Sequence, residues 1–440
     1  MKKTVAILSG LGLLFLIMIG VFSANTLAAE TEPEDFFLTD PELGRFIQIV
    51  LRDNPEILAA RRDWKAGLER PAQVRTLPDP QVTIRYFAES IETRIGPQNS
   101  VLELTQPVPW PGKLSTAGRR ADHLAASLRE KIRQVERNLV RDFKRAYYDL
   151  AYIQEALRVN EEEQGLLTRF EQIALTRYST GEGIQQNVIK VQTEITRLMD
   201  QHTFLSERRD ILLKRLAQLM GQPEVILEAR EIPLPAPSMP VSIRDLEEKA
   251  LENRPEILSI KEEILADGLL VSRRRLDWRP DFRFGISYTN IGNREDLGGI
   301  LSPPSDNGED ALALVAGIRI PLYGKRISSG VREAQEIQQA GFRRLESEQD
   351  RVQYEVQEAI LRLESLLERT ELYRGTLIPQ AEHSLSSSEA AYQTNQLIFL
   401  DLLDAERVWF QVRLAYHRLL SDFWITAAEL ERATGMKFPA

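Results

Sequence analysis

The sequence predicts a mixed α/β fold that is mostly helical and is built from one module that occurs twice. Landmark residues recur in the same order about 200 positions apart, and long amphipathic helical runs alternate with short strand-like segments. The recurring landmarks are Pro55-Glu56-Ile57-Leu58 and Pro255-Glu256-Ile257-Leu258, Pro80 and Pro280, Gly112-Lys113 and Gly324-Lys325, Tyr178 and Tyr392, and Gly221 and Gly435. A solenoid unit has only roughly 20–50 residues, so we expect a duplicated module and a protomer with an internal two-fold repeat.

The two copies define the domain organisation that we expect. The first repeat covers residues 30–221 and the second covers residues 242–440. A linker at residues 222–241 contains five prolines and is expected to be extended. Each copy should run in the order helix, strand, loop, strand, very long helix, turn and returning helix.

The N-terminus has the pattern of an export signal. Lys2 and Lys3 precede an apolar run at residues 5–22, and small residues follow at 23–29. We expect residues 1–29 to be removed on export, and the alternative is an uncleaved anchor. The chain has no cysteine, which excludes disulfides, thiolate metal sites and a lipid-modified N-terminal cysteine.

Composition and motifs argue against several classes of function. The net charge of −9 argues against a nucleic-acid partner, because such proteins need a basic face. The four histidines are isolated, and no nucleotide-binding loop or nucleophile motif is present. We therefore expect no enzyme activity, no cofactor and no metal site.

Four segments, two in each copy, alternate apolar and polar residues with the period of a β-strand. They lie at about residues 81–88, 100–106, 281–290 and 311–320. A tilted membrane strand needs roughly 9–11 residues with this alternation. A water-soluble hairpin with one face on a protein core has the same pattern, so alternation alone leaves both possibilities open.

Two helical hairpins are expected at about residues 113–221 and 324–435. No helix breaker follows Lys113 before the turn at Tyr178, and apolar residues between 352 and 377 recur in alternating steps of four and three. This 3.5-residue period predicts a left-handed supercoiled seam. At ~1.5 Å per residue, each long helix would extend roughly 100 Å.

Four strands cannot close a barrel, which takes about eight or more. Open strand edges cannot lie in lipid, because their N–H and C=O groups find no partners there. If the strands enter a membrane, several chains must share one barrel, and the attached hairpins would form a tube below it. The alternative is a soluble periplasmic coiled-coil scaffold or adaptor protein.

Several motifs resemble the TolC family of outer-membrane efflux proteins. Residues 392–395, followed by Leu400-Asp401-Leu402-Leu403-Asp404-Ala405-Glu406-Arg407, resemble the second tip hairpin of that family. Residues 106–113 resemble the strand-to-helix joint of its heavy-metal (CzcC/CusC-like) branch. Residues 54–57 and 254–257 resemble the family's helix openers. The resemblance covers essentially the whole chain after the leader.

The resemblance implies a homotrimer in which four strands per chain contribute to a twelve-stranded β-barrel above an α-helical barrel. Such a trimer is the exit duct of a tripartite pump in the outer membrane, with a periplasmic extension. Its partners would be outer-membrane lipid, a periplasmic adaptor (membrane fusion) protein and an inner-membrane efflux transporter. The branch points to metal ions as cargo, with drugs or other small molecules as the alternative.

The resemblance also implies roles for six residues near the helical tips. Asp401 and Asp404 match the acids that ring the periplasmic mouth, where they form the gate. The alternative for these acids is plain solvation, with Asp404 paired to Arg407 at i+3. The residues that we expect to contact the adaptor are Tyr178 and Gly181 at the first tip, and Tyr392 and Asn395 at the second.

Overall fold

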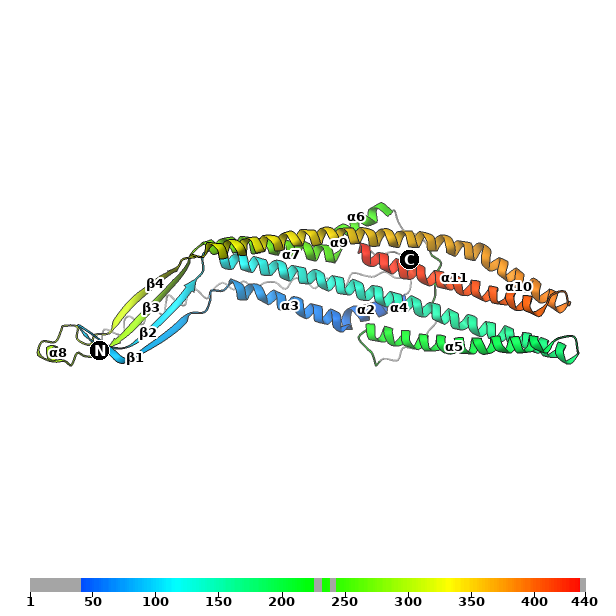
Figure 1. Ribbon diagram of the computed structural model, residues 1–440, viewed down its shortest axis with the longest axis horizontal. Coiled ribbons are helices and arrows are strands. Elements are labelled where there is room, and N and C mark those ends of the chain that lie inside the picture. Colours follow the sequence, from blue (N-terminus) through cyan, green and yellow to red (C-terminus); the bar gives the residue numbers. More distant parts are fainter. Residues whose placement is uncertain (1–40, 225–231, 238–242, 436–440) are drawn as a thin grey trace. The chain divides into compact units, whose positions relative to one another are not determined.

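The computed structural model describes residues 41–224, 232–237 and 243–435, and the structural statements below concern these residues (Figure 1). The expected export signal at residues 1–29 lies outside the described residues, as do positions 225–231 and 238–242, which include most of the expected linker. Among the described helices, none is both long and apolar enough to cross a membrane.

The helices follow the same order in both copies. In the first copy they are α2 (Pro41–Asp53), α3 (Pro55–Arg75), α4 (Lys113–Ser179) and α5 (Gln185–Leu219). In the second they are α6 (Ile243–Asn253), α7 (Pro255–Arg275), α9 (Gly324–Leu372), α10 (Ile378–Gln393) and α11 (Phe399–Thr434), with a 3-10 turn at Leu276–Trp278 and the short α8 (Leu297–Leu301) as additions. The expected internal repeat is confirmed.

The four strands form one antiparallel sheet in the order β1-β2-β3-β4. They are β1 (Gln81–Thr93), β2 (Gly96–Val108), β3 (Asp281–Ile291) and β4 (Ala311–Arg319). β2 of the first copy pairs directly with β3 of the second, so the two copies share the sheet. Within the described protomer, β1 and β4 are therefore edges with one neighbour each.

The helices of the two copies also interlock. α4 packs against α3 and α5 of its own copy and against α7 and α11 of the other, and α9 packs against α7 and α11. Figure 1 shows α4 and α5 running side by side, and likewise α10 and α11. With 67 residues at ~1.5 Å each, α4 is about 100 Å long.

The heptad positions form the buried seams of the long helices. The buried seam residues of α4 are Leu139, Phe143, Ala146, Leu150, Ile153 and Leu157, and those of α9 are Val352, Val356, Ala359, Leu363, Leu366 and Thr370. Their alternating spacing of four and three keeps one face of each helix on its neighbours, as in a coiled coil.

The second long helix departs from the expected unbroken period near its end. A π-helical turn at Tyr373–Leu377 separates α9 from α10, just before Pro379. Proline has no N–H, and its ring clashes with the carbonyl four residues earlier, here that of Gly375. A π turn relieves this crowding. In the first copy Gly165 occupies the position equivalent to Pro379, and α4 continues through Gly165 as one helix.

A buried charge network joins α7, α9 and α11. Arg254 is fully buried, and its guanidinium lies 2.6 Å from Glu355 and 3.3 Å from Glu256. Arg432 of α11 contacts the same two carboxylates at 3.0 and 3.3 Å. These contacts and nearby Arg351 hold the pKa of Glu355 below its usual value, although burial acts in the opposite direction as the largest single influence.

The first copy has no charged side chain at the position equivalent to Arg254. Asn54 occupies the position equivalent to Arg254, immediately before the proline that begins the helix. Its side chain accepts a hydrogen bond from the N–H of Glu56 and donates one to the carbonyl of Leu219, both at 2.8 Å. One N-cap position thus holds a neutral cap in one copy and an ionic network in the other.

We predict that Arg254→Ala lowers the free energy of unfolding by ~3–5 kcal/mol, because Glu256 and Glu355 lose a buried partner. Thermal denaturation of the purified protein measures this loss. Arg343→Ala is the control, since that side chain is 82% exposed and should contribute less than about 0.5 kcal/mol. Equal effects of the two substitutions would show that the network is not stabilising.

Candidate functional site

One face of the sheet is apolar from edge to edge. Cross-strand pairing aligns residues of all four strands in rows, and the two central rows are Ile84, Leu102, Tyr288 and Leu312, and Val82, Leu104, Ile286 and Leu314. These eight side chains are between 40 and 87% exposed. The described residues therefore leave this face uncovered, which does not fit a hairpin packed on a protein core.

The opposite face carries small and polar side chains. Its equivalent rows are Thr83, Glu103, Ser287 and Ala313, and Arg85, Val101, Thr289 and Ala311. A sheet that is apolar on one side and polar on the other has the pattern of a membrane barrel wall with an aqueous interior. The open edges at β1 and β4 must find partners if the apolar face lies in lipid.

The two helical tips have the same backbone conformation. Gly181 and Asn395 occupy equivalent positions with φ of +78° and +60°, and Asn395 is the one non-glycine residue with positive φ in the described ranges. The N–H of Glu182 donates to the carbonyl of Arg177 at 2.9 Å, and the N–H of Gln396 donates to that of Ala391 at 2.8 Å. Glycine and asparagine are the residues that tolerate this left-handed helix end.

Arg177 links the two tips. Its guanidinium donates to the carbonyls of Tyr392 and Gln393 at 2.8 and 3.2 Å and lies 4.3 Å from the centroid of the Tyr392 ring. Tyr392 is only 5% exposed and packs against Phe399, whereas the equivalent Tyr178 is 47% exposed. The duplicated tyrosines thus differ: Tyr392 anchors the tips to each other, and Tyr178 remains available for contact.

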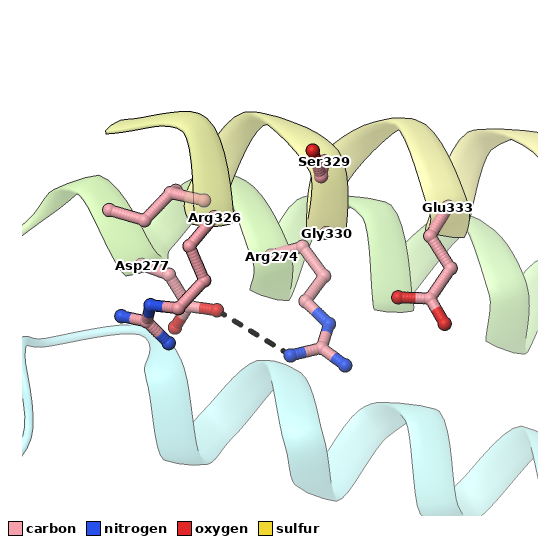
Figure 2. A pocket seen from close by; sticks show the side chains of 7 residues that line it. Arg274, Asp277, Arg326, Ser329, Gly330 and Glu333 are labelled. Atoms are coloured by element: carbon pink, nitrogen blue, oxygen red, sulfur yellow. Dashed lines mark ion pairs between the residues drawn. The ribbon is translucent and has the colours of Figure 1, made fainter. Parts of the chain in front are cut away.

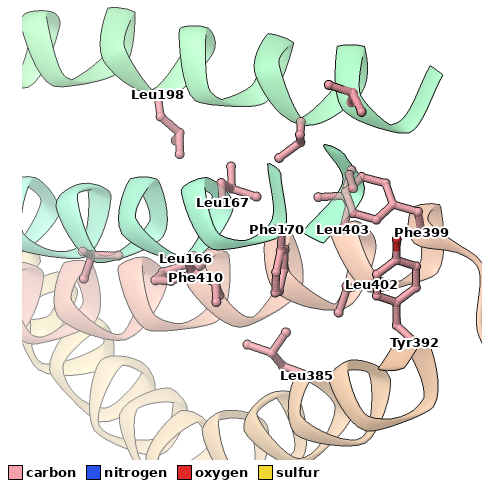
Figure 3. Packing of buried hydrophobic residues seen from close by; sticks show 14 residues of the cluster. Leu166, Leu167, Phe170, Leu198, Leu385, Tyr392, Phe399, Leu402, Leu403 and Phe410 are labelled. Carbon is pink, nitrogen blue, oxygen red and sulfur yellow. The ribbon is translucent and has the colours of Figure 1, made fainter. Parts of the chain in front are cut away.

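A buried apolar cluster lies beneath the tips. It contains residues of α4, α5, α10 and α11, so both hairpins contribute to it. Figure 3 shows Leu402 near Tyr392 at the tip end of the cluster, and Leu166 and Phe410 farther from the tip. The cluster fixes the positions of the two tips relative to each other.

Asp401 and Asp404 lie on the exposed face of α11 near its start. Both are exposed, whereas Leu402 and Leu403 between them are buried in the apolar cluster. Neither carboxylate has a hydrogen-bond or ion-pair partner among the described residues. The alternative pairing of Asp404 with Arg407 is wrong, because Arg407 contacts Glu194 of α5 at 3.2 Å instead.

Two buried acids near this site were not identified from the sequence. Glu406 of α11 and Glu163 of α4 are only 3% and 6% exposed, and Oε1 of Glu406 has no hydrogen-bond partner in the described structure. Arg197, which forms an ion pair with Glu194 at 2.7 Å, comes no closer than 4.0 Å to Glu163. The burial of Glu406 could have been predicted from helical spacing, because Glu406 comes four and three residues after the buried Leu402 and Leu403 and so lies on the same face of the helix.

Burial is the largest cause of the shifted ionisation of both acids. It raises the pKa of Glu406 to about 8, with repulsion from Glu163 adding to the effect. It raises the pKa of Glu163 to about 7, against the opposing attraction of Arg197. Near neutral pH, Glu406 thus favours the protonated form, and Glu163 is close to the midpoint of its titration.

The geometry defines a class of protein in which a sheet with the pattern of a membrane barrel wall carries long helical hairpins. The family profile described as Outer membrane efflux protein matches residues 46–222 and 246–436, one match for each copy. The chain belongs to the outer membrane efflux protein family, which confirms the resemblance to TolC-family channels. It is an outer-membrane protein with a periplasmic extension.

Similar proteins are found by sequence and by structure. The cobalt-zinc-cadmium resistance protein CzcC of Cupriavidus metallidurans is 20% identical over 394 residues, covering 88% of each chain. A membrane protein from Pseudomonas aeruginosa matches with a TM-score of 0.77 and 17% identity over 94% of this chain and 97% of that one. CusC matches with the same TM-score and identity over 93% and 95%. The likeness to these structures, together with the four-stranded sheet, confirms the expected fold class.

We predict that the protein loses stability as the pH rises from about 4.5 to about 8. The folded state holds the Glu163 and Glu406 protons more tightly than the unfolded state, in which the pKa of each is 4.5. The stabilisation is therefore full below pH 4.5 and falls with rising pH until the folded groups have ionised too. Glu406→Gln should raise stability at pH 9 by about 1–3 kcal/mol and flatten this pH dependence. Thermal melting between pH 5 and 9 measures both effects.

Glu364→Gln provides the matched control, since this exposed glutamate lies on α9 outside the buried acid pair. It should leave the pH profile unchanged. A Glu406→Gln profile parallel to that of the unmodified protein would contradict the assignment.

Proposed function

We propose that three copies of this chain form the exit channel of a tripartite efflux system, which conducts substrates passively across the periplasm and the outer membrane. The single observation that carries the proposal is a four-stranded sheet with one uncovered apolar face and two open edges. Three such sheets supply twelve strands, enough to close a barrel and satisfy every edge in lipid.

The helical hairpins supply the periplasmic part of the proposed channel. α4 continues for 67 residues beyond the joint at Lys113, and α9 and α10 cover the equivalent length in the second copy. Hairpins from three protomers would continue the barrel as a helical tube. Conduction through such a tube requires positioning and solvation of the cargo, and no catalytic step.

A soluble periplasmic scaffold is the weaker alternative. It would have to keep eight exposed apolar side chains of the sheet in water, a patch typical of a membrane or protein interface. The family match over both repeats also favours the channel.

Cell fractionation and conductance test the proposed function. The protein should occur in outer membranes as a trimer that dissociates on heating, and the purified trimer should conduct ions across a planar bilayer. A protein that is monomeric, soluble in water and without conductance would overturn the proposal.

We propose divalent metal cations as cargo, with Asp401 and Asp404 at the periplasmic mouth. The name of CzcC refers to resistance against cobalt, zinc and cadmium, and that protein is similar along 88% of this chain. Exposed carboxylates without partners are the groups that attract cations to a pore. In a trimer they would provide six carboxylates in one ring.

We predict that Asp401→Asn combined with Asp404→Asn lowers the cation-over-anion permeability ratio of the channel severalfold, because the mouth loses its negative charge. Reversal potentials in a planar bilayer under a salt gradient measure the ratio. Asp350→Asn, an exposed change within α9, should leave it unaltered. Equal selectivity of all three channels would place the two acids outside the conduction path.

We propose that the tips contact a periplasmic adaptor. Exposed apolar side chains gather there, namely Tyr178, Ile184, Ile398 and Leu400. Gly181 and Asn395 support the contact indirectly, since their left-handed conformations shape the two turns. Tyr392 acts as an internal anchor in this proposal, because its ring is buried.

We predict that Tyr178→Ala combined with Ile398→Ala reduces crosslinking to the adaptor and resistance to the cargo at least fivefold, with trimer assembly intact. Susceptibility of a deletion strain carrying each variant provides the measurement, alongside immunoblots for the trimer. Tyr354→Ala, which removes an exposed tyrosine from α9, is the control: Tyr354 is 63% exposed, compared with 47% for Tyr178. Full resistance in the double variant would contradict the tip contact.

A further inference from the structure

We propose that the joint between the sheet and the helices in the second repeat binds the phosphate of a membrane phospholipid, in a cavity between α7 and the start of α9. The inference rests on the proposed insertion of the sheet into the outer membrane. The ligand is a phosphate-bearing lipid headgroup of the periplasmic leaflet.

The joint is strongly basic in a chain that is acidic overall. Residues 273–283 contain five arginines and two aspartates, and residues 319–326 contain three basic residues and no acid. The equivalent segments of the first copy, residues 73–83 and 107–114, contain one arginine, one aspartate and one lysine. The positive charge therefore belongs to one defined place in each protomer and is not a general property of the repeat.

A cavity of about 460 Å³ lies within this basic segment. Figure 2 shows that Arg274 of α7 and Arg326 of α9 extend toward it from different helices, with Ser329 and Gly330 on the wall. Gly330 leaves the wall open, since an added Cβ would have only the Cδ of Arg274 within 4 Å, at 3.9 Å. Two guanidinium groups on facing helices suit a phosphate, which accepts paired hydrogen bonds from each.

The acids around the cavity do not neutralise these arginines. Asp277 is 2.7 Å from Arg273 and 3.9 Å from both Lys113 and Arg274, so several cations share it. Arg326 has no carboxylate within ion-pair distance in the described structure. Glu333, at the far end of the cavity, has no ion-pair partner in the described structure either. Its negative charge repels a phosphate, so the ligand would bind near Arg326.

Aromatic and apolar side chains beside the cavity fix the level of the membrane surface. Trp278, Leu322 and Tyr323 are 50%, 79% and 76% exposed and lie between the strands and the cavity. Tryptophan and tyrosine gather where lipid headgroups meet water, and a belt of them borders each rim of a membrane barrel. The guanidinium groups lie on the helical side of this belt, the level at which lipid phosphates occur.

Native mass spectrometry of the detergent-purified trimer, with added phosphatidylglycerol, tests the inference. The unmodified protein should retain lipid. Arg274→Gln combined with Arg326→Gln should weaken binding about 25-fold, because the loss of each basic residue weakens it about fivefold. Arg326→Gln alone keeps the Arg274–Asp277 contact and should weaken binding about fivefold. Arg343→Gln combined with Arg362→Gln removes two exposed arginines of α9 and should have no effect.

Competition with inorganic phosphate distinguishes the two possible ligands, a lipid headgroup and free phosphate. Displacement of the lipid by phosphate at equal concentration would assign the site to free phosphate and overturn the lipid proposal. Unchanged lipid binding in both arginine variants would also overturn it. Failure of the unmodified protein to trimerise or to insert into liposomes would instead contradict the proposed function.

Discussion

Every backbone N–H and C=O that lies in lipid must be hydrogen-bonded within protein, and this requirement explains how the sheet and the hairpins are arranged. The sheet offers apolar rows such as Ile84, Leu102, Tyr288 and Leu312 on one face, yet its first and last strands each have one neighbour. A single chain cannot satisfy both edges. The proposed trimer meets this requirement, because each edge strand then pairs with a neighbouring protomer. In that trimer the long hairpins, which follow the strands, would share the symmetry of the barrel.

The two copies share the same order of helices and strands, but they differ at several equivalent positions. Asn54 and Arg254 occupy one helix-opening position but make a neutral cap and an ionic network. Gly165 and Pro379 leave one long helix continuous and interrupt the other with a π turn. The basic joint likewise occurs in the second copy alone. For Asn54 and Arg254 the neighbours differ too, because Asn54 contacts the end of α5 whereas Arg254 contacts α9.

Charge is distributed along the helices according to its surroundings. Exposed pairs such as Arg343 and Glu346 contribute little to stability, because water screens them. The buried acids Glu163 and Glu406 have no matching buried cations in close contact, and burial raises the pKa of both because it penalises the charged form. The exposed acids Asp401 and Asp404 lie on the same helix as Glu406, so one short segment carries carboxyl groups in opposite environments.

The duplication could be predicted from the sequence because landmark residues recur in the same order about 200 positions apart. The strand alternation, the heptad seams and the tip turns could also be predicted, because each is a pattern among residues close together in the chain. The assignment of Asp401 and Asp404 to the periplasmic mouth came from the resemblance to the family, and it stays a prediction. Contacts between distant residues could not be predicted from the sequence. Arg407 contacts Glu194 rather than Asp404, Glu406 lies near Glu163, and Arg177 donates to the carbonyl of Tyr392. These partners are more than 200 positions apart, and their energies depend on burial and distance in space, which local periodicity does not encode.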